Sequence, residues 1–257
     1  NQVSAKIGQS LESDAREFNR SQPRKSFIKM SMKFSGRTSF INLPASALEE
    51  MEQKIQCEKC GARYAVVGSA FYCPCCGHNS AKLTFFNTID KVKAKINNLD
   101  VVRKALEVVS KDEAARTCTS LVETSVPDLV VAFQRLCECV YPQIEGAKPL
   151  KRNVFQRLDD GNKLWHDLVG NGYDDWITDV QYAKLRKCFQ QRHLLQHQDG
   201  IVDQDYITKS GDVSYQVGQH LIIKAEDITE YAEIVETLGK RVLALLEEVK
   251  ADEQSSN

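Results

Sequence analysis

The chain has 257 residues, of which 42% are hydrophobic and 27% are charged, and its formal net charge is −1. A chain of this length can bury a sizeable core in one large domain or in two modest ones. No uninterrupted apolar run is longer than Leu129–Phe133, which is far shorter than the roughly 20 residues of a membrane-spanning helix. The polar first 20 residues lack the apolar segment of a secretory signal. We therefore expect a soluble globular protein in the cytoplasm.

Charge is distributed unevenly along the chain. Residues 1–110 contain 17 Lys/Arg and 10 Asp/Glu, whereas residues 111–257 contain 17 Lys/Arg and 25 Asp/Glu. A basic half is typical of contact with a polyanion such as RNA, because each neutralised phosphate releases counterions. A basic surface that is merely solvated has the same composition, so both interpretations stay open.

Four of the nine cysteines follow the spacing C-x2-C-x12-C-x2-C: Cys57, Cys60, Cys73 and Cys76. Thiolates separated by two residues can bind one tetrahedral ion, and the glycine after each pair permits a tight turn that directs backbone N–H groups at the sulfurs. Four sulfur ligands leave no position for water or substrate, so the pattern predicts a structural Zn²⁺ site. Cys75 and His78 are alternative ligands. We prefer Cys76 because a glycine follows it, as one follows Cys60.

The zinc site is predicted to belong to a small basic N-terminal module over residues 1–82, with a zinc ribbon over 57–78. The segment between the cysteine pairs, residues 62–72, is β-prone with a central glycine and predicts a hairpin. The other cysteines of interest fall in helical patterns, and we expect them to be reduced core residues of a cytoplasmic protein: Cys118, Cys137, Cys139 and Cys188.

Two further elements are predicted before the first cysteine. Residues 26–43 alternate between apolar and polar side chains, like a strand or a hairpin. Residues 43–56 have the pattern of a short helix with Ser46 as its N-cap.

After the last cysteine of the ribbon the pattern becomes helical. Residues 85–109 form a long candidate helix, and we assign residues 83–111 as a helical linker. Another helix is expected to begin near Pro127 and to end at residues 141–143. Residues 202–227 predict a structured loop or small hairpin. The last helix has apolar residues at steps of three and four: Ile228, Tyr231, Ile234, Val235, Leu238, Val242 and Leu245.

An arginine stands out in the helix that starts near Asp179 and is expected to end at Gly200, which can cap it. The apolar positions of this helix cluster on one face, and Arg192 falls near the middle of that face. A buried unpaired guanidinium costs several kcal/mol, so Arg192 needs a carboxylate, a dimer mate or a ligand phosphate. His193 and His197 lie one turn apart at the edge of the same face. Cationic and imidazole groups are therefore expected to meet at a helix end.

Three interpretations of these residues stay open. The first is a structural arginine paired with an acid, beside two surface histidines. The second is metal binding by His193 and His197, although the sequence offers no HExxH-type acid between them and no evident third ligand. The third is RNA cleavage. RNA carries its own nucleophile, the 2′-hydroxyl, so a nuclease needs only a group of near-neutral pKa and a fixed cation, which histidine and arginine supply.

The segment R-H-L-L-Q-H, Arg192 to His197, resembles the R-x4-6-H motif of HEPN domains. The flanking FQQ and the following QDGIVDQDYITKSGD and VGQHLIIKAED resemble the HEPN branch of the ApeA-like anti-phage proteins. The resemblance covers roughly residues 112–250. HEPN toxins that are regulated by nucleotide transfer have a tyrosine two places after the motif histidine. This chain has Asp199 there, so the resemblance does not extend to that regulation.

The resemblance implies a HEPN-like helical domain over residues 112–257 that forms a homodimer and cleaves RNA without a metal, in anti-phage defence or a toxin-like role. It implies that Arg192 binds the phosphate, His197 is the general acid/base, and His193 supports it. A defence-system or antitoxin protein is the implied partner. On an ideal helix Arg192 and His197 are about 140° apart. A bulge, the helix end at Gly200 or a site shared across the dimer axis would bring them together, and we favour the shared site.

The whole chain is thus predicted to be mainly α, a HEPN-like helical bundle with a small N-terminal β-containing zinc-ribbon module. A function of another class stays open, in which a non-catalytic, zinc-containing dimer binds RNA or protein and uses the bundle as a scaffold. The acidic second half of the chain is less favourable for RNA approach than the basic first half.

Overall fold

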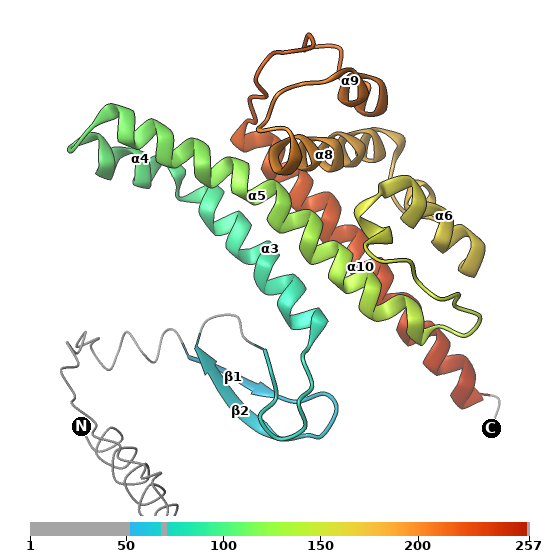
Figure 1. The fold of residues 1–257 in the computed structure, drawn as a ribbon. Helices are drawn as coiled ribbons and strands as arrows, with labels where there is room; N and C mark the ends of the chain where they lie inside the picture. The colour runs from blue at the N-terminus through green and yellow to red at the C-terminus, as the bar shows by residue number, and fades with distance from the viewer. Residues whose placement is uncertain (1–51, 68–70, 256–257) are drawn as a thin grey trace, which may run out of the picture. The chain divides into compact units, whose positions relative to one another are not determined.

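The structure is a computed structural model that describes residues 52–67 and 71–255 (Figure 1). The chain divides into two units, residues 1–50 and 51–257. The strand or hairpin predicted for residues 26–43 and the N-terminal part of the predicted helix at 43–56 lie outside the described residues. So does most of the basic N-terminal sequence.

The described part is mainly helical with a small sheet near its N-terminal end, which confirms the predicted architecture at that level. Its elements are β1 (Glu52–Gln56), β2 (Arg63–Val67), α3 (Ala81–Asn97), α4 (Leu99–Glu107), α5 (Lys111–Val140), η1 (Tyr141–Gln143), η2 (Val154–Gln156), α6 (Leu158–Val169), α7 (Tyr173–Trp176), α8 (Asp179–His197), α9 (Gln204–Ser210) and α10 (Ala225–Ser255). None of the described helices is both long and apolar enough to cross a bilayer.

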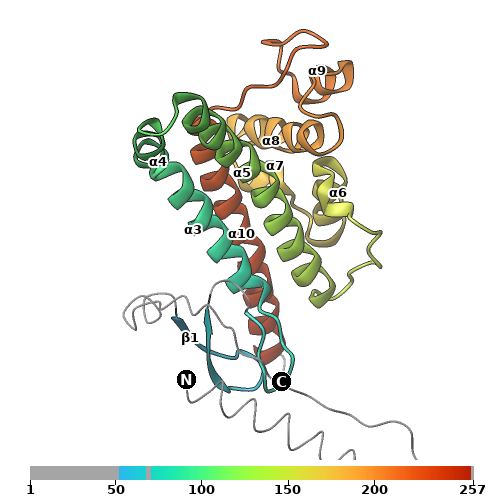
Figure 2. The same ribbon diagram turned by 60° about the vertical axis from the view of Figure 1, so that its left-hand side comes forward.

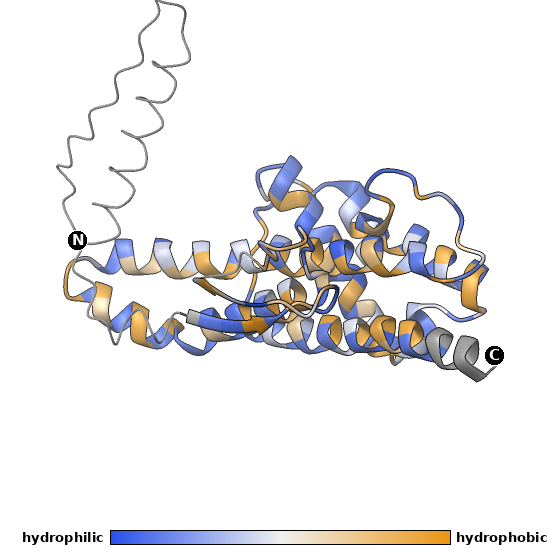
Figure 3. Ribbon diagram, turned by 90° about the horizontal axis from the view of Figure 1, so that it is seen from below, coloured by the Kyte–Doolittle hydropathy of each residue, from blue (hydrophilic) through white to orange (hydrophobic). Residues whose placement is uncertain are grey.

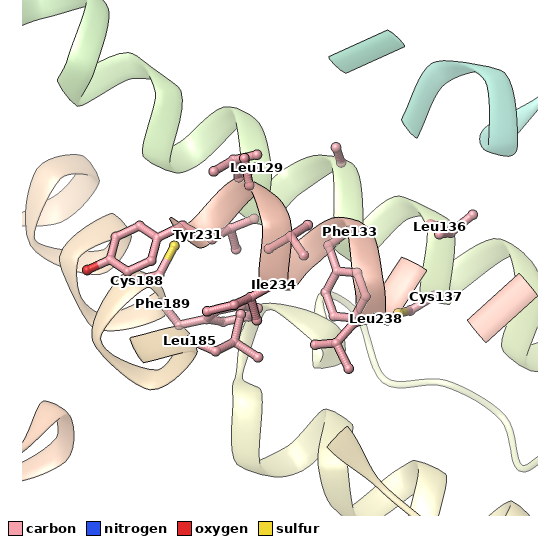
Figure 4. Close-up of a cluster of buried hydrophobic side chains, with 14 of the residues drawn as sticks. Leu129, Phe133, Leu136, Cys137, Leu185, Cys188, Phe189, Tyr231, Ile234 and Leu238 are labelled. Atoms are coloured by element: carbon pink, nitrogen blue, oxygen red, sulfur yellow. The ribbon is translucent and has the colours of Figure 1, made fainter. Parts of the chain in front are cut away.

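Helix α5 is the centre of the bundle. Helices α3, α4, α8 and α10 all pack against it, and α3, α5 and α10 run side by side in both views (Figures 1 and 2). The long helices carry both hydrophobic and hydrophilic residues (Figure 3), as expected for helices that bury one face. The core between α5, α8 and α10 is filled by their apolar side chains (Figure 4), among them Leu129, Phe133, Leu185, Phe189, Tyr231, Ile234 and Leu238.

Two helix predictions are corrected by this packing. The segment assigned as a linker, residues 83–111, is helical, but Phe85, Ile89 and Val92 of α3 are buried in the common core, so it is part of the bundle. The helix predicted to begin near Pro127 begins at Lys111 instead and contains that proline. It continues because the residues before Pro127, such as Val122, are buried in the same core as those after it.

Two segments have different local structures from those expected. Residues 52–56, predicted as the end of a helix, form strand β1 and pair antiparallel with β2, from Glu52 opposite Val67 to Gln56 opposite Arg63. Their backbone hydrogen bonds are thus made across a sheet rather than along a helix. The segment 202–227, predicted as a loop or hairpin, contains helix α9. Asp203 caps α9 by accepting a hydrogen bond from the N–H of Tyr206 at 2.7 Å.

Candidate functional site

The two cysteine pairs lie in turns of the same construction. In the first turn, the N–H of Cys57 donates to Ala62 O at 2.8 Å and the N–H of Gly61 donates to Cys57 O at 2.9 Å. The second turn repeats these bonds with Cys73 as its first residue. Both glycines have positive φ, +72° at Gly61 and +71° at Gly77, a conformation that glycine adopts without steric cost. Strands β1 and β2 pair on either side of the first turn, and an isolated bridge between Tyr72 and Asn79 closes the second.

The four predicted cysteines form one cluster. Every pair of their sulfurs lies within 4.8 Å, and the separations between Cys57 and Cys76 and between Cys60 and Cys73 are 3.6 and 3.7 Å. A tetrahedral ion with bonds of about 2.3 Å to sulfur requires separations of about 3.8 Å. The donor set and its spacing thus fit a tetrahedral metal. Neither Cys75 nor His78 belongs to this group.

Among the cluster thiols, the pKa of Cys57 is lowered, whereas those of Cys60 and Cys76 are raised. The burial of Cys57 opposes the charged form, but hydrogen bonds from the backbone N–H groups of Cys60 and Lys59 and from neighbouring thiols lower its pKa to about 7. Thiolate is the form that binds metal. Of the cysteines predicted to be core residues, Cys118, Cys137 and Cys188 are buried as expected. Cys139 is exposed, because its position on α5 is turned away from the core, so that prediction is corrected.

Helix α8 presents the arginine and the two histidines. It begins with a capping box in which the Thr178 side chain accepts from the N–H of Gln181, and the Gln181 side chain accepts from the N–H of Thr178. At the other end Asp199 and Gly200 both adopt positive φ, +51° and +74°. The N–H groups of residues 198 and 200 both donate to Leu194 O. The predicted start near Asp179 is thus confirmed. The helix ends at His197 with Gln198 as its C-cap, three residues before the end predicted at Gly200.

Arg192 is buried, with 8% of its surface exposed. Its Nε has no hydrogen-bond partner, and no carboxylate of the described residues forms an ion pair with it. Burial lowers the pKa of the guanidinium, which nevertheless stays cationic at neutral pH. The described residues therefore do not support the interpretation of Arg192 as a structural arginine paired with an acid of a neighbouring helix.

His193 and His197 are both exposed, and their ring centroids are 5.1 Å apart. His193 is exposed overall, but partial dehydration of its ring lowers its pKa, and the neighbouring His197 lowers it further. Among the described residues, neither histidine is part of a group of three or more metal-ligating side chains. The described residues therefore offer no third ligand for a metal bound by His193 and His197.

Arg192, His193 and His197 line the same cavity, whose volume is about 370 Å³. All three belong to one chain, so the cavity does not need a second copy to bring them together. Helix α8 also contributes Phe189 and Gln190. The remaining walls come from the connection between α5 and α6, from the start of α6 and from α9: Asn153, Gln156, Arg157, Leu158, Asp159, Asp160 and Lys209.

The other charged groups of this cavity have partners. Arg157 forms an ion pair with Asp160, Asp159 lies 3.8 Å from Arg186, and Lys209 binds Asp205 at 2.7 Å. Within the described residues, Arg192 is the cavity cation that lacks a carboxylate. An anion that entered the cavity would therefore meet an uncompensated positive charge at its wall.

Helix α9, which carries Lys209, is fixed to α8 through Asp212. This carboxylate binds Lys187 at 2.9 Å and accepts from the Tyr206 hydroxyl at 2.9 Å. Burial opposes the charge of Asp212, but hydrogen bonds from Ser214 and Lys187 lower its pKa to about 2. Lys209 was not among the predicted site residues. Asp203 as an N-cap and Gly211 as a C-cap are the signals that could have located its helix.

His166 lies outside this cavity, and its pKa is shifted in the opposite direction from that of His193. Its Nε2 lies 2.8 Å from an oxygen of Asp174 and 3.5 Å from one of Asp175. The hydrogen bond to Asp174 raises the pKa of His166 although burial opposes it. Both carboxylates are exposed, so this group has the features of a surface ion pair.

Comparisons with known proteins returned no matching family model, no matching curated protein and no matching solved structure. The function is therefore inferred from the residues of this chain and their geometry.

Proposed function

We propose that the Arg192 cavity cleaves RNA by attack of the ribose 2′-hydroxyl on the adjacent phosphate, without a metal ion. His197 takes the proton of the 2′-hydroxyl as the 2′-oxygen bonds to phosphorus. The bond between phosphorus and the 5′-oxygen then breaks, and the 5′-oxygen receives a proton from the protonated imidazole. The products are a 2′,3′-cyclic phosphate and a 5′-hydroxyl. Imidazole suits both transfers because its ordinary pKa is near neutral.

The observation that carries this proposal is the buried, uncompensated charge of Arg192 in a cavity with two imidazoles. A fixed cation in a partly dehydrated site stabilises the extra negative charge that develops on the phosphorane. A charge kept for stability alone would be expected to have a carboxylate partner, because an unpaired buried charge is unfavourable. A phosphate group of a ligand supplies the missing counter-charge.

His193 supports this chemistry as a second imidazole beside His197. Since its pKa is lowered by burial and by His197, the neutral form of His193 is favoured at neutral pH. Neutral imidazole can accept one hydrogen bond and donate another. His193 is therefore suited to orient the 2′-hydroxyl or the phosphate next to His197.

We further propose that Cys57, Cys60, Cys73 and Cys76 hold one structural Zn²⁺. The sulfur separations of 3.6 and 3.7 Å support it. A site with four sulfur ligands has no open position for substrate, so it would fix the fold of its two turns rather than take part in the reaction.

A non-catalytic RNA- or protein-binding dimer is the alternative. It is favoured by the two carboxylates at the cavity, Asp159 and Asp160, since these reduce the attraction for a polyanion. The homodimer and the defence or toxin-like role implied by the HEPN resemblance stay predictions. Light scattering coupled to size-exclusion chromatography would test the first.

Incubating the purified protein with mixed RNA in EDTA separates the two functions. The enzyme proposal predicts cleavage with cyclic-phosphate ends, and predicts that Arg192→Ala abolishes it while RNA with a 2′-deoxyribose at the cut position stays intact. Binding without cleavage, or cleavage that requires Mg²⁺, would support the alternative or a different mechanism.

A further inference from the structure

We infer that the Arg192 cavity also reads a base of the bound RNA, with adenine preferred over guanine, through the side-chain amides of Asn153 and Gln156. This inference rests on the proposed function, because it concerns the substrate of the same cavity. Neither amide was a candidate in the sequence pattern. The structure places both in the wall of the cavity that holds Arg192 and the two histidines.

The cavity has walls of two kinds. Helix α8 contributes the cation and the imidazoles, and the connection between α5 and α6 contributes Asn153 and Gln156. A phosphate needs cationic donors, whereas a base needs groups that both donate and accept hydrogen bonds. A volume of about 370 Å³ is within the usual range for a small-ligand pocket. The two walls together fit a nucleotide rather than phosphate alone.

The amide of Asn153 is held by a buried residue behind it. Gln134 is 5% exposed, and its Nε2 donates to Glu138 at 2.8 Å and to Asn153 Oδ1 at 3.5 Å. The carbonyl oxygen of Asn153 is thereby engaged by the protein, with one lone pair still available. Its two N–H groups make no hydrogen bond within the described residues. A donor and an acceptor on the same amide are thus available to a ligand.

Adenine has the matching pattern. Its N6 amino group donates and its N7 accepts on one edge, so an Asn or Gln amide can bind both atoms. Guanine presents two acceptors, O6 and N7, on the same edge and would place an acceptor against the amide oxygen. Single-stranded RNA exposes these edges, because its bases are unstacked.

The competing explanation of Asn153 is conformational. Its φ is +56° and its ψ is 27°, and asparagine is among the few residues other than glycine that adopt this left-handed region. Asn153→Gly separates the two explanations, because glycine fits the backbone and removes the amide. Asn171→Gly is the matched control, since Asn171 is exposed and is not among the residues that line the cavity.

The test measures binding rather than cleavage, in the inactive His197→Ala protein. The probes are two 11-residue oligoribonucleotides with one central adenine or guanine in oligouridine. We expect roughly tenfold tighter binding of the adenine probe, which is the discrimination expected from one side-chain amide that hydrogen-bonds to one base. The ratio should fall to about 1 with Asn153→Gly and stay unchanged with Asn171→Gly. The melting temperature of Asn153→Gly should not fall.

Equal affinity for the two probes, tighter binding of guanine, or an unchanged ratio in Asn153→Gly would each overturn base reading. A reduced preference in Gln156→Glu, which keeps the size of the side chain, would support the second amide, and an unchanged preference would remove it. Because binding is read without turnover, failure of this inference is distinguishable from failure of the proposed cleavage, which only the active protein can show.

Discussion

The cysteine cluster and the Arg192 cavity are built in different ways. The four sulfurs come from two short turns, each with its own glycine and its own backbone hydrogen bonds. The cavity instead collects side chains from α6, α8, α9 and the connection after α5. A local pattern can therefore specify the first site almost completely, whereas the second depends on how distant segments pack. A substitution should have a local structural effect in the first site and a chemical effect in the second.

The largest effect is expected from Cys60→Ser. Losing one of four sulfur ligands should release the metal and unfold the two turns, because metal binding in such units supplies roughly 10–16 kcal/mol of folding free energy. Native mass spectrometry would count the bound Zn²⁺, and limited proteolysis would detect the unfolded turns. The bundle, with its own core, should stay folded.

Cys75→Ser is the matched control, since Cys75 lies between two cluster cysteines but outside the cluster. It should keep the metal. If Cys75→Ser lost Zn²⁺, or if Cys60→Ser kept both metal and fold, the assignment of these four ligands would be wrong.

Arg192→Met should differ from Cys60→Ser, because we expect a large loss of activity and no loss of stability. Cleavage is expected to fall roughly 10²–10³-fold, the usual effect of removing one group that stabilises transition-state charge. The free energy of unfolding should stay constant or rise, because the guanidinium is buried without a described carboxylate partner and methionine fills a similar volume. Urea unfolding and single-turnover cleavage measure the two quantities.

Lys184→Met is the control for loss of charge on α8, because Lys184 pairs with Glu230 at 2.6 Å and neither residue lines the cavity. It should cleave at close to the normal rate. A strong destabilisation by Arg192→Met would instead return Arg192 to the role of a paired structural charge.

Asp212→Asn should have an intermediate effect. The pKa of Asp212, about 2 in the folded protein against an ordinary 3.8, means that its charge stabilises the fold above pH 4. This contribution is lost as the pH falls from about 4 to 2. We expect the substitution to cost on the order of 1–2 kcal/mol at pH 7 and little at pH 2. It should also weaken the attachment of α9, which hydrogen exchange of residues 204–210 would detect.

The smallest effect concerns two histidines. The pKa of His166 is raised and that of His193 is lowered, so NMR titration should find them on opposite sides of about 6.5. His166 stabilises the fold below its unfolded pKa and loses this contribution as the pH rises through its folded pKa. For His193, whose pKa is lowered, the fold loses stability as the pH falls, because protonation of its ring is disfavoured in the folded state. Asp174→Asn should remove only the upward shift of His166.

The sequence predicted the cysteine cluster more completely than the Arg192 cavity. The cysteine spacing identified all four members of the sulfur cluster, because turns of this kind are determined within six residues. The apolar steps of α8 correctly placed Arg192 on a buried face, which a helical period alone can do. Strand β1 was missed, since its sequence has a helix-like pattern and its strand form depends on pairing with β2.

The cavity itself could not be predicted. The angle of about 140° between Arg192 and His197 on an ideal helix suggested a site shared between two chains. Both residues nevertheless border one cavity, because its other walls come from residues 153–160 and from Lys209. Residues 153–160 are more than 30 positions from Arg192 in the sequence, and Lys209 lies on a different helix, so no local period connects them to α8.

The central claim is that Arg192 and His197 form a metal-independent ribonuclease site. The most direct measurement is cleavage, in EDTA, of a defined RNA and of the same RNA with one 2′-deoxyribose at the cut position, by the wild type and by His197→Ala. We predict a 2′,3′-cyclic phosphate product from the wild type on the all-ribose substrate, no product from the deoxy substrate, and a loss of roughly 10²–10⁴-fold in rate for His197→Ala. Cleavage of the deoxy substrate, or a normal rate for His197→Ala, would contradict the claim.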